Sequence, residues 1–126
     1  MASLYEIVGG DQWFQDLCSR FYDRVDKDPV LRPLYPPGLQ EFEASRDWLA
    51  QFLVQFWGGP GAYSEARGHP RLRMRHMHFR LGQKERDLWF QYMSEALAEG
   101  GLTPEVEAEV LAYFDNAATQ MINVEE

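Results

Sequence analysis

Cysteine is nearly absent from this chain of 126 residues, in which Cys18 is the only one. A single cysteine excludes an internal disulfide bond and any zinc site built from cysteine ligands. The chain also lacks an apolar run approaching the roughly 18 to 20 residues that a membrane span requires. The segment from Met1 to Glu6 has neither a basic start nor an apolar stretch, so no export signal is expected. These absences predict a cytoplasmic protein without a membrane span.

Positive charge is scarce, because the chain carries 12 Lys and Arg against 20 Asp and Glu, for a net charge of −8. That balance argues against nucleic acid or an anionic membrane surface as a partner. The basic residues are nevertheless concentrated, since residues 67–86 contain seven of them and one acidic residue, Glu85. This segment favours either a small anionic partner or ion pairs with the acidic remainder of the chain, and the second reading is the more common.

Motifs for phosphate binding and for nucleophilic catalysis are missing as well. The glycines that begin at Gly58 have no strand before them and no Lys-Ser/Thr pair after them, so they do not form a phosphate loop. No serine lies in a nucleophile-elbow motif. Cys18 lies on the inner face of its predicted helix, where a thiol is usually inert. Histidine and aromatic side chains are therefore the main candidates for chemistry.

No segment alternates between apolar and polar residues with the period of a strand, and every strong periodicity is helical. Hydrophobic residues make up 45% of the chain, which is enough for a folded core. We therefore predict an all-α fold in which residues 1–126 form a single domain. The expected helical segments are residues 3–8 with the capping-box spacing of Ser3 and Glu6, Asp11 as N-cap through Val25, a turn that opens with Asp28 as N-cap before Pro29, residues 42–56, Arg71 through Phe79, a helix between Gly82 and Gly100-Gly101, and Thr103 through Met121. The spacing of apolar residues predicts three inner faces: Phe14, Leu17, Cys18, Phe21, Tyr22 and Val25; Phe42, Ser45, Leu49, Phe52, Leu53 and Phe56; and Val106, Val110, Phe114, Ala117 and Met121.

A long irregular segment separates two of these helices. Residues 58–70 contain four glycines and two prolines, so they cannot form regular secondary structure. A loop of this length is uncommon in a compact domain and is more often functional than a plain connector.

Histidine is the first candidate for chemistry, and the chain has three: His69, His76 and His78. His76 shares one helix face with Leu72 and Phe79, so its imidazole is expected among apolar side chains. A histidine in that position is more often a hydrogen-bonded core residue than a metal ligand, and the residues alone leave both readings open. His76 and His78 cannot chelate one metal together, because helical residues two apart face different sides.

Tyr22, Tyr35 and Trp89 are the second set of candidates. Periodicity places Tyr22 and Trp89 on the inner faces of their helices. Buried phenol and indole groups need hydrogen-bond partners, because an unpaired donor costs about 1–3 kcal/mol. Two readings remain open: the three are core residues bonded to backbone carbonyls, or they converge on a polar ligand inside an apolar cavity.

Six short segments occur along the chain in an order that carries a family resemblance. They are Gly9-Gly10, Arg20-Phe21-Tyr22, Leu34-Tyr35-Pro36, Trp57-Gly58-Gly59-Pro60, the run from Gly68 to His76, and Glu85-Arg86-Asp87-Leu88-Trp89. Together they resemble the group II truncated haemoglobins of bacteria over nearly the whole chain. The resemblance implies a truncated globin fold, a two-over-two helical sandwich with a long loop before the proximal-histidine helix. Residues 58–70 match that loop.

The resemblance implies that His76 is the proximal ligand of a haem iron whose opposite coordination position stays open. The cofactor would be haem b held noncovalently, because the chain has no Cys-x-x-Cys-His run. Arg75 matches a partner for a haem propionate, which makes haem the small anion that the basic segment favours. The implied distal, ligand-facing residues are Tyr22, Tyr35, Trp89, Ser45 and Leu49. The other implied haem contacts are Leu72, Phe52, Phe21, Phe79 and Tyr63.

Ser45 stands where animal globins have their distal histidine, and either a weak donor or an access route for ligand fits that place. The implied ligands are O2, CO and NO. Donors aimed at O2 on ferrous haem stabilise it, because the bound gas gains negative charge. Two hydrogen bonds of roughly 1–1.5 kcal/mol each slow its release by about 30- to 150-fold.

Three hypotheses for function follow. The leading one is a haem protein that binds O2, CO and NO and releases O2 slowly. The second is an enzyme, a nitric oxide dioxygenase or a peroxidase, that uses the same pocket with an unidentified reductase. The third is a helical interaction module without haem, which would show no Soret band. The sequence leaves the oligomeric state open, a homodimer included.

Overall fold

The structure is a computed structural model, and it describes residues 3–59 and 81–122. Every regular element within these two ranges is helical, so the all-α prediction is confirmed there. No helix in the same ranges is both long and apolar enough to cross a membrane. The predicted loop beyond Gly59 and the predicted helix from Arg71 to Phe79 lie outside the described residues.

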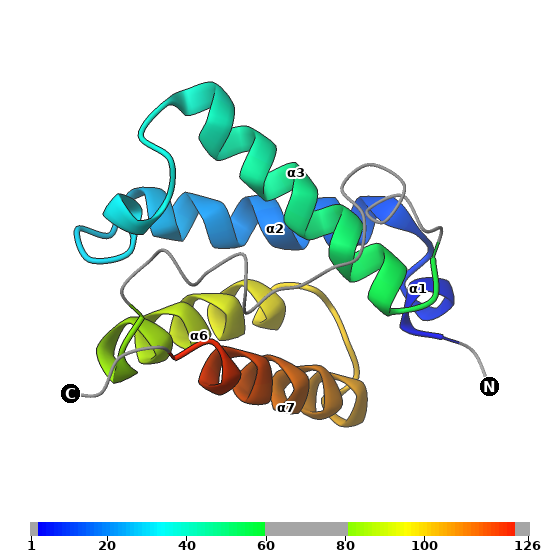
Figure 1. The fold of residues 1–126 in the computed structure, drawn as a ribbon. Coiled ribbons are helices and arrows are strands. Elements are labelled where there is room, and N and C mark those ends of the chain that lie inside the picture. The colour runs from blue at the N-terminus through cyan, green and yellow to red at the C-terminus, as the bar shows by residue number, and fades with distance from the viewer. Residues whose placement is uncertain (1–2, 60–80, 123–126) are drawn as a thin grey trace. The chain divides into compact units, whose positions relative to one another are not determined.

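The chain divides into two compact units, and unit 1 comprises residues 1–22 and 36–70. Its helices are α1 (Leu4–Ile7), α2 (Asp11–Asp26) as far as Tyr22, and α3 (Leu39–Phe56) (Figure 1). Phe14 near the start of α2 stacks on Trp57 at the end of α3, with ring centroids 6.3 Å apart. Tyr22 lies against Phe42 near the start of α3, so α2 and α3 run antiparallel within this unit.

The ends of the unit 1 helices follow local chemistry. Ser3 Oγ accepts a hydrogen bond from the backbone N–H of Glu6 at 3.3 Å, which confirms the predicted cap. Asp11 is the first residue of α2 rather than its N-cap. Gly58, just after α3, has φ of +97°, and a Cβ atom there would lie 2.7 Å from Ser3 Cβ. The chain therefore requires glycine at this position.

The core of unit 1 is the inner face of α2, as the periodicity predicts. Its buried side chains are Phe14, Leu17, Cys18, Phe21 and Tyr22. The prediction that Phe56 continues the inner face of α3 is wrong, because its side chain is 49% exposed. Trp57 stacks on Phe14, so the inward position at the end of α3 belongs to Trp57.

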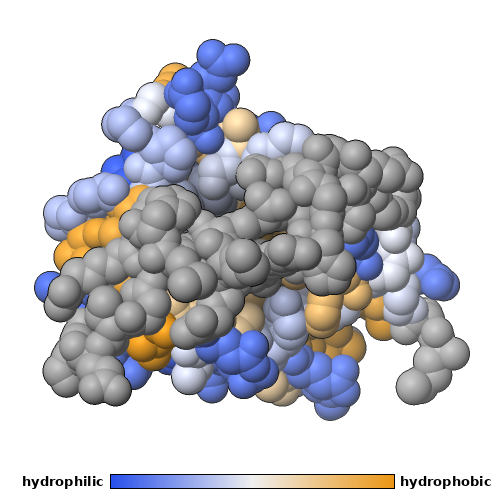
Figure 2. All heavy atoms as spheres, viewed as in Figure 1, coloured by the Kyte–Doolittle hydropathy of each residue, from blue (hydrophilic) through white to orange (hydrophobic). Residues whose placement is uncertain are grey.

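Apolar side chains also reach the surface. Hydrophilic and apolar residues lie next to one another on the visible part of the described surface (Figure 2). The large apolar side chains that are most exposed are Ile7, Leu39 and Phe56. All three lie at or near the end of a helix, so their exposure reflects helix ends that extend past the core.

Unit 2 comprises residues 23–35 and 71–126. Its described elements are the end of α2, η1 (Arg32–Leu34), α6 (Gln83–Ala98) and α7 (Pro104–Gln120). Helices α6 and α7 lie side by side and run antiparallel (Figure 1). Thr103 Oγ1 caps α7 by accepting a hydrogen bond from the N–H of Val106, as predicted.

The interior of unit 2 differs from the prediction at one position of α7. Val110 and Phe114 are buried as expected, but the next buried residue is Ala118 and not Ala117. The inner face therefore advances by four residues at each step, which keeps it on one side of an ideal helix. Met93, Ala96 and Leu97 are the buried residues of α6.

Asp28 connects the short turn of unit 2 to α6. Its Oδ1 accepts hydrogen bonds from the N–H groups of Val30 at 2.8 Å and Leu31 at 2.9 Å, which holds the turn that precedes η1, but the predicted N-cap position belongs to Leu31. The helical turn is a 3₁₀ helix that begins at Arg32, later than predicted. The hydroxyl of Tyr92 donates to Asp28 Oδ2, which ties α6 to this turn.

The hydrogen bond between Tyr92 and Asp28 shifts the pKa values of both side chains. Burial alone would raise the pKa of Asp28, but the hydrogen bonds from Tyr92, Leu31 and Val30 outweigh it and lower the pKa below 3.8. The same hydrogen bond raises the pKa of Tyr92 to about 12. Asp28 therefore contributes stability above pH 3.8 that is lost as the pH falls through its lowered pKa. Tyr92 contributes stability below pH 10.0 that is lost as the pH rises toward 12.

Replacing Tyr92 by phenylalanine is expected to lower the free energy of unfolding at neutral pH by about 1–3 kcal/mol, because a buried carboxylate loses a donor. It should also weaken the loss of stability in acid and in alkali, as measured by urea unfolding across the pH range. Tyr113→Phe is the control, since burial raises the pKa of Tyr113 and Asp28 plays no part. That control should change only the alkaline side. Equal acid sensitivity in the wild type and Tyr92→Phe would contradict this assignment.

Candidate functional site

The predicted site residues fall into a described and an undescribed group. His76, Arg75, Leu72, Phe79 and Tyr63 lie outside the described residues and stay predictions. The described ones divide between the units: Tyr22, Phe21, Ser45, Leu49 and Phe52 in unit 1, and Tyr35 and Trp89 in unit 2.

In unit 1 the structure pairs two of the predicted distal residues. Tyr22 on α2 is 4% exposed, and its phenol oxygen lies 2.8 Å from Oγ of Ser45 on α3. Either oxygen can be the donor. The Tyr22 ring is held by Phe21, edge-on at 5.6 Å, and by Phe42 at 5.0 Å. The ring of the tyrosine is thus fixed in place by two aromatic neighbours.

The remaining predicted residues of unit 1 are Leu49 and Phe52 on α3 and Phe21 on α2. Leu49 is half-buried and lies four residues after Ser45, so the two share one helix face. Phe52 is buried and continues that face. Phe21 has no exposed surface, so it acts as a support for Tyr22.

Unit 2 contains a small cavity, and two further predicted distal residues line it. Its volume is about 40 Å³, more than the roughly 10–15 Å³ that a water molecule requires on the same measure. Tyr35 follows η1, and Trp89 lies in the first half of α6. The cavity is lined by Leu31, Leu34, Tyr35, Leu81, Glu85, Arg86, Trp89, Ala118 and Met121. An apolar wall therefore surrounds one phenol and one indole.

Trp89 is held in place by α7. Its ring meets that of Phe114 edge-on at a centroid distance of 6.0 Å. Such an arrangement fixes the indole without using its N–H group. The backbone N–H of Tyr35 donates to the carbonyl of Arg32 at 3.1 Å, which fixes the end of η1. The Trp89 ring is thus positioned by α7, and the backbone of Tyr35 by η1.

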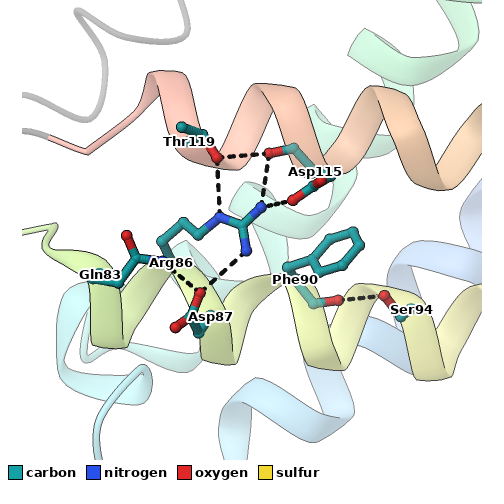
Figure 3. A network of polar contacts seen from close by, with 7 residues as sticks. All are labelled: Gln83, Arg86, Asp87, Phe90, Ser94, Asp115 and Thr119. Carbon is teal, nitrogen blue, oxygen red and sulfur yellow. Dashed lines mark hydrogen bonds and ion pairs between the residues drawn. The ribbon is translucent and has the colours of Figure 1, made fainter.

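The charged residues of the cavity wall are engaged in contacts that hold the helix. Glu85 Oε1 accepts a hydrogen bond from the backbone N–H of Gly82 at 2.9 Å, which caps α6. Arg86 crosses to α7, where its guanidinium donates to Thr119 Oγ1 at 3.1 Å and binds the carbonyl and the carboxylate of Asp115 (Figure 3). It also donates to Asp87 Oδ1 at 3.1 Å. Arg86 thus links α6, the helix that carries Trp89, to α7.

The sequence indicated this segment only as part of a family motif. Nothing in its periodicity identified Arg86 as a link to α7, because its partners Asp115 and Thr119 lie 29 and 33 residues further on. The one available signal was the mixed charge of Glu85-Arg86-Asp87 beside Trp89. Cys18 is on the inner face of α2 as predicted, and burial raises the pKa of its thiol to about 12.

Comparison with known proteins places this arrangement in a family. The family model described as Bacterial-like globin matches residues 3–123. Group 2 truncated hemoglobin YjbI of Bacillus subtilis (strain 168) is 34% identical to the chain over 119 residues, which are 94% of this chain and 87% of that protein.

Solved structures agree with this match. A thermostable hemoglobin from Thermobifida fusca is 46% identical, with a TM-score of 0.92, over 98% of this chain and 99% of that one. The group II truncated hemoglobin of Bacillus anthracis is 32% identical, with a TM-score of 0.91, over 100% of this chain and 95% of that one. Globins bind haem and, through it, diatomic gases such as O2. The chain belongs to the bacterial-like globin family, and within it to the group II truncated haemoglobins, which have the two-on-two helical fold.

Proposed function

We propose that the chain holds haem b noncovalently, with His76 as the proximal ligand of a five-coordinate iron. Haem supplies the iron to which O2, CO and NO bind reversibly. Tyr22, Tyr35 and Trp89 act as the distal donors beside the gas, and O2 leaves slowly. The observation that carries this proposal is the cavity of unit 2, in which Tyr35 and Trp89 lie together within an apolar wall.

The chemistry of that wall fits haem. A porphyrin is a large apolar ring, and sites for such ligands are mostly apolar with a few polar groups at chosen places. Leu31, Leu34 and Met121 supply apolar surface, while the cap and the cross-helix contacts engage Glu85 and Arg86. Both charged side chains among the described lining residues therefore have hydrogen-bond partners on α6 or α7.

The distal donors act through hydrogen bonds to a gas that gains negative charge when it binds. A phenol O–H and an indole N–H can each donate one such bond, and neither group carries charge of its own. In apolar surroundings, hydrogen bonds of this kind are stronger than in water. The proposed result is slow release of O2.

The remaining predicted residues complete the proposed site. Arg75 pairs with a haem propionate through its guanidinium fork. The proposed apolar contacts with haem are Leu72, Phe52, Phe79 and Tyr63, with Phe21 supporting Tyr22 from behind. One family model matches residues 3–123, which supports a single globin domain for this site.

Titration of the purified chain with hemin tests the proposal. We expect a Soret band that saturates at an equimolar ratio and, after reduction, shifts on addition of CO. Hemin bound without a defined endpoint, or reduced protein whose spectrum CO leaves unchanged, would refute the proposed function. That result would favour a helical interaction module without haem.

A further inference from the structure

Asp28 is the only charged residue that is buried among residues 3–59 and 81–122, where it is 9% exposed. A buried carboxylate is costly unless hydrogen-bond donors surround it. The backbone N–H groups of Val30 and Leu31 donate to its Oδ1, and the Tyr92 hydroxyl on α6 donates to its Oδ2. The first two bonds form within the turn itself. The bond from Tyr92 joins the turn to another helix, so it needs a separate explanation.

A series of backbone hydrogen bonds connects Asp28 to Tyr35. The Asp28 carbonyl accepts a bond from the N–H of Arg32 at 3.0 Å, and the Arg32 carbonyl accepts one from the N–H of Tyr35 at 3.1 Å. Within the same segment, the Leu31 carbonyl accepts a bond from the N–H of Leu34 at 2.9 Å. Leu31, Leu34 and Tyr35 all line the cavity of unit 2. Because these bonds hold the segment together, a shift of Asp28 relative to α6 carries Tyr35 with it.

The other end of this link lies one helical turn from the cavity. Tyr92 and Trp89 are three residues apart on α6, so they occupy neighbouring positions on one face of the helix. The turn segment meets this helix at Tyr92 through Asp28, and it reaches the cavity that Trp89 lines through Tyr35. The bond between Tyr92 and Asp28 therefore sets the register of the segment on α6. A buried polar contact adds little net stability over an apolar one, but it can specify a single arrangement.

We propose that Asp28 and Tyr92 are positioning residues, and that their hydrogen bond places Tyr35 in the cavity of unit 2 together with Trp89. The inference rests on the proposed function in one respect, since Tyr35 is there a donor to a bound gas. Neither Asp28 nor Tyr92 is among the described residues that line the cavity. They therefore act on the ligand through the turn and η1 and not by direct contact.

The position of Tyr35 can be followed by NMR in Tyr92→Phe, which removes this bond and keeps the hydrogen bonds of the turn itself. In the full chain labelled with ¹³C in its six tyrosines, the Tyr35 ring resonance, assigned with Tyr35→Phe, should shift, because it responds to neighbouring aromatic rings. The spectrum can be recorded before hemin is added and in the CO complex. It therefore decides the placement of Tyr35 even if the hemin titration refutes the proposed function.

Two variants serve as matched controls. Val110→Ala removes buried side-chain volume from α7, so it lowers stability through packing alone. Arg24→Gln removes a second polar link to α6, the ion pairs with Glu95 and Glu99, which is more exposed and worth less. Both should leave the Tyr35 resonance in place, whereas a merely structural role for Tyr92 would make Tyr92→Phe resemble them.

Stopped-flow measurement of O2 release tests the consequence for the ligand. Tyr92→Phe should speed O2 dissociation by roughly three- to tenfold, the effect of weakening one hydrogen bond. In the Tyr35→Phe background, the same substitution should change the rate little, because its route to the ligand is gone.

Four results would overturn the inference. An unmoved Tyr35 resonance in Tyr92→Phe would show that packing places Tyr35 without this bond. An equal shift in Val110→Ala or Arg24→Gln would show that Tyr35 responds to any loss of stability. A shifted resonance with an unchanged release rate would show that the placement of Tyr35 does not affect the ligand. An equal acceleration in the Tyr35→Phe background would show that Tyr92 acts by another route.

Discussion

Replacing His76 by alanine is expected to abolish the Soret band of the reconstituted chain. In the proposed site this imidazole is the protein's bond to iron, and the haem is held by no covalent link. Removing residues that merely support a metal ligand weakens metal binding by roughly 10- to 100-fold, so removing the ligand itself should cost more. Hemin titration followed by absorbance measures the affinity, and imidazole added to the solution should restore part of the band.

The chain provides matched controls, because it has two other histidines. His78→Ala and His69→Ala remove the same side chain from the same segment, and both should bind hemin as the wild type does. If His76→Ala keeps an unaltered spectrum and gas affinity, the proximal assignment is wrong. If His78→Ala is the variant that loses haem, the ligand is misplaced by two residues.

Replacing Tyr35 and Trp89 together by phenylalanine is expected to speed O2 dissociation by about 30- to 150-fold. Each change removes one donor from the same cavity, and two hydrogen bonds of roughly 1–1.5 kcal/mol each account for the factor. Stopped-flow measurement of O2 release gives the rate directly. Each single variant should show roughly a 5- to 13-fold effect on the same basis.

Met121→Leu is the control for this pair, because Met121 lines the cavity without a strong donor. The substitution changes shape at nearly constant volume, which cores tolerate well. It should leave O2 release within about twofold of the wild type. If Met121→Leu accelerates release as much as the double variant does, cavity shape rather than donation controls the rate.

Local features of the sequence predicted much of the fold. Ser3 and Thr103 cap their helices as expected, since a cap depends on atoms a few residues away. The errors lie at helix ends and on one face. Phe56 turns outward because Trp57 takes the inward place, and the periodic spacing alone cannot separate two adjacent aromatics.

The sequence likewise predicted some features of the candidate site and missed others. The order of motifs identified the globin family, and periodicity placed Tyr22 on an inner face. Neither the motifs nor the periodicity identified Ser45 as the partner of Tyr22, 23 residues away, or Tyr92 as the partner of Asp28, 64 residues away. Helical periodicity tells which face is buried but not which other face it meets.

The sequence by itself determined the described helices, most of their buried faces and the family, because these depend on neighbours within a turn or on the order of short motifs. Only the tertiary structure decided that Tyr35 and Trp89 share one cavity, that Arg86 ties α6 to α7, and that Ser45 meets the phenol of Tyr22. Each of these contacts joins segments far apart in the chain. The packing of the helices determines the distances between these side chains, and the residue pattern along a single helix does not predict that packing.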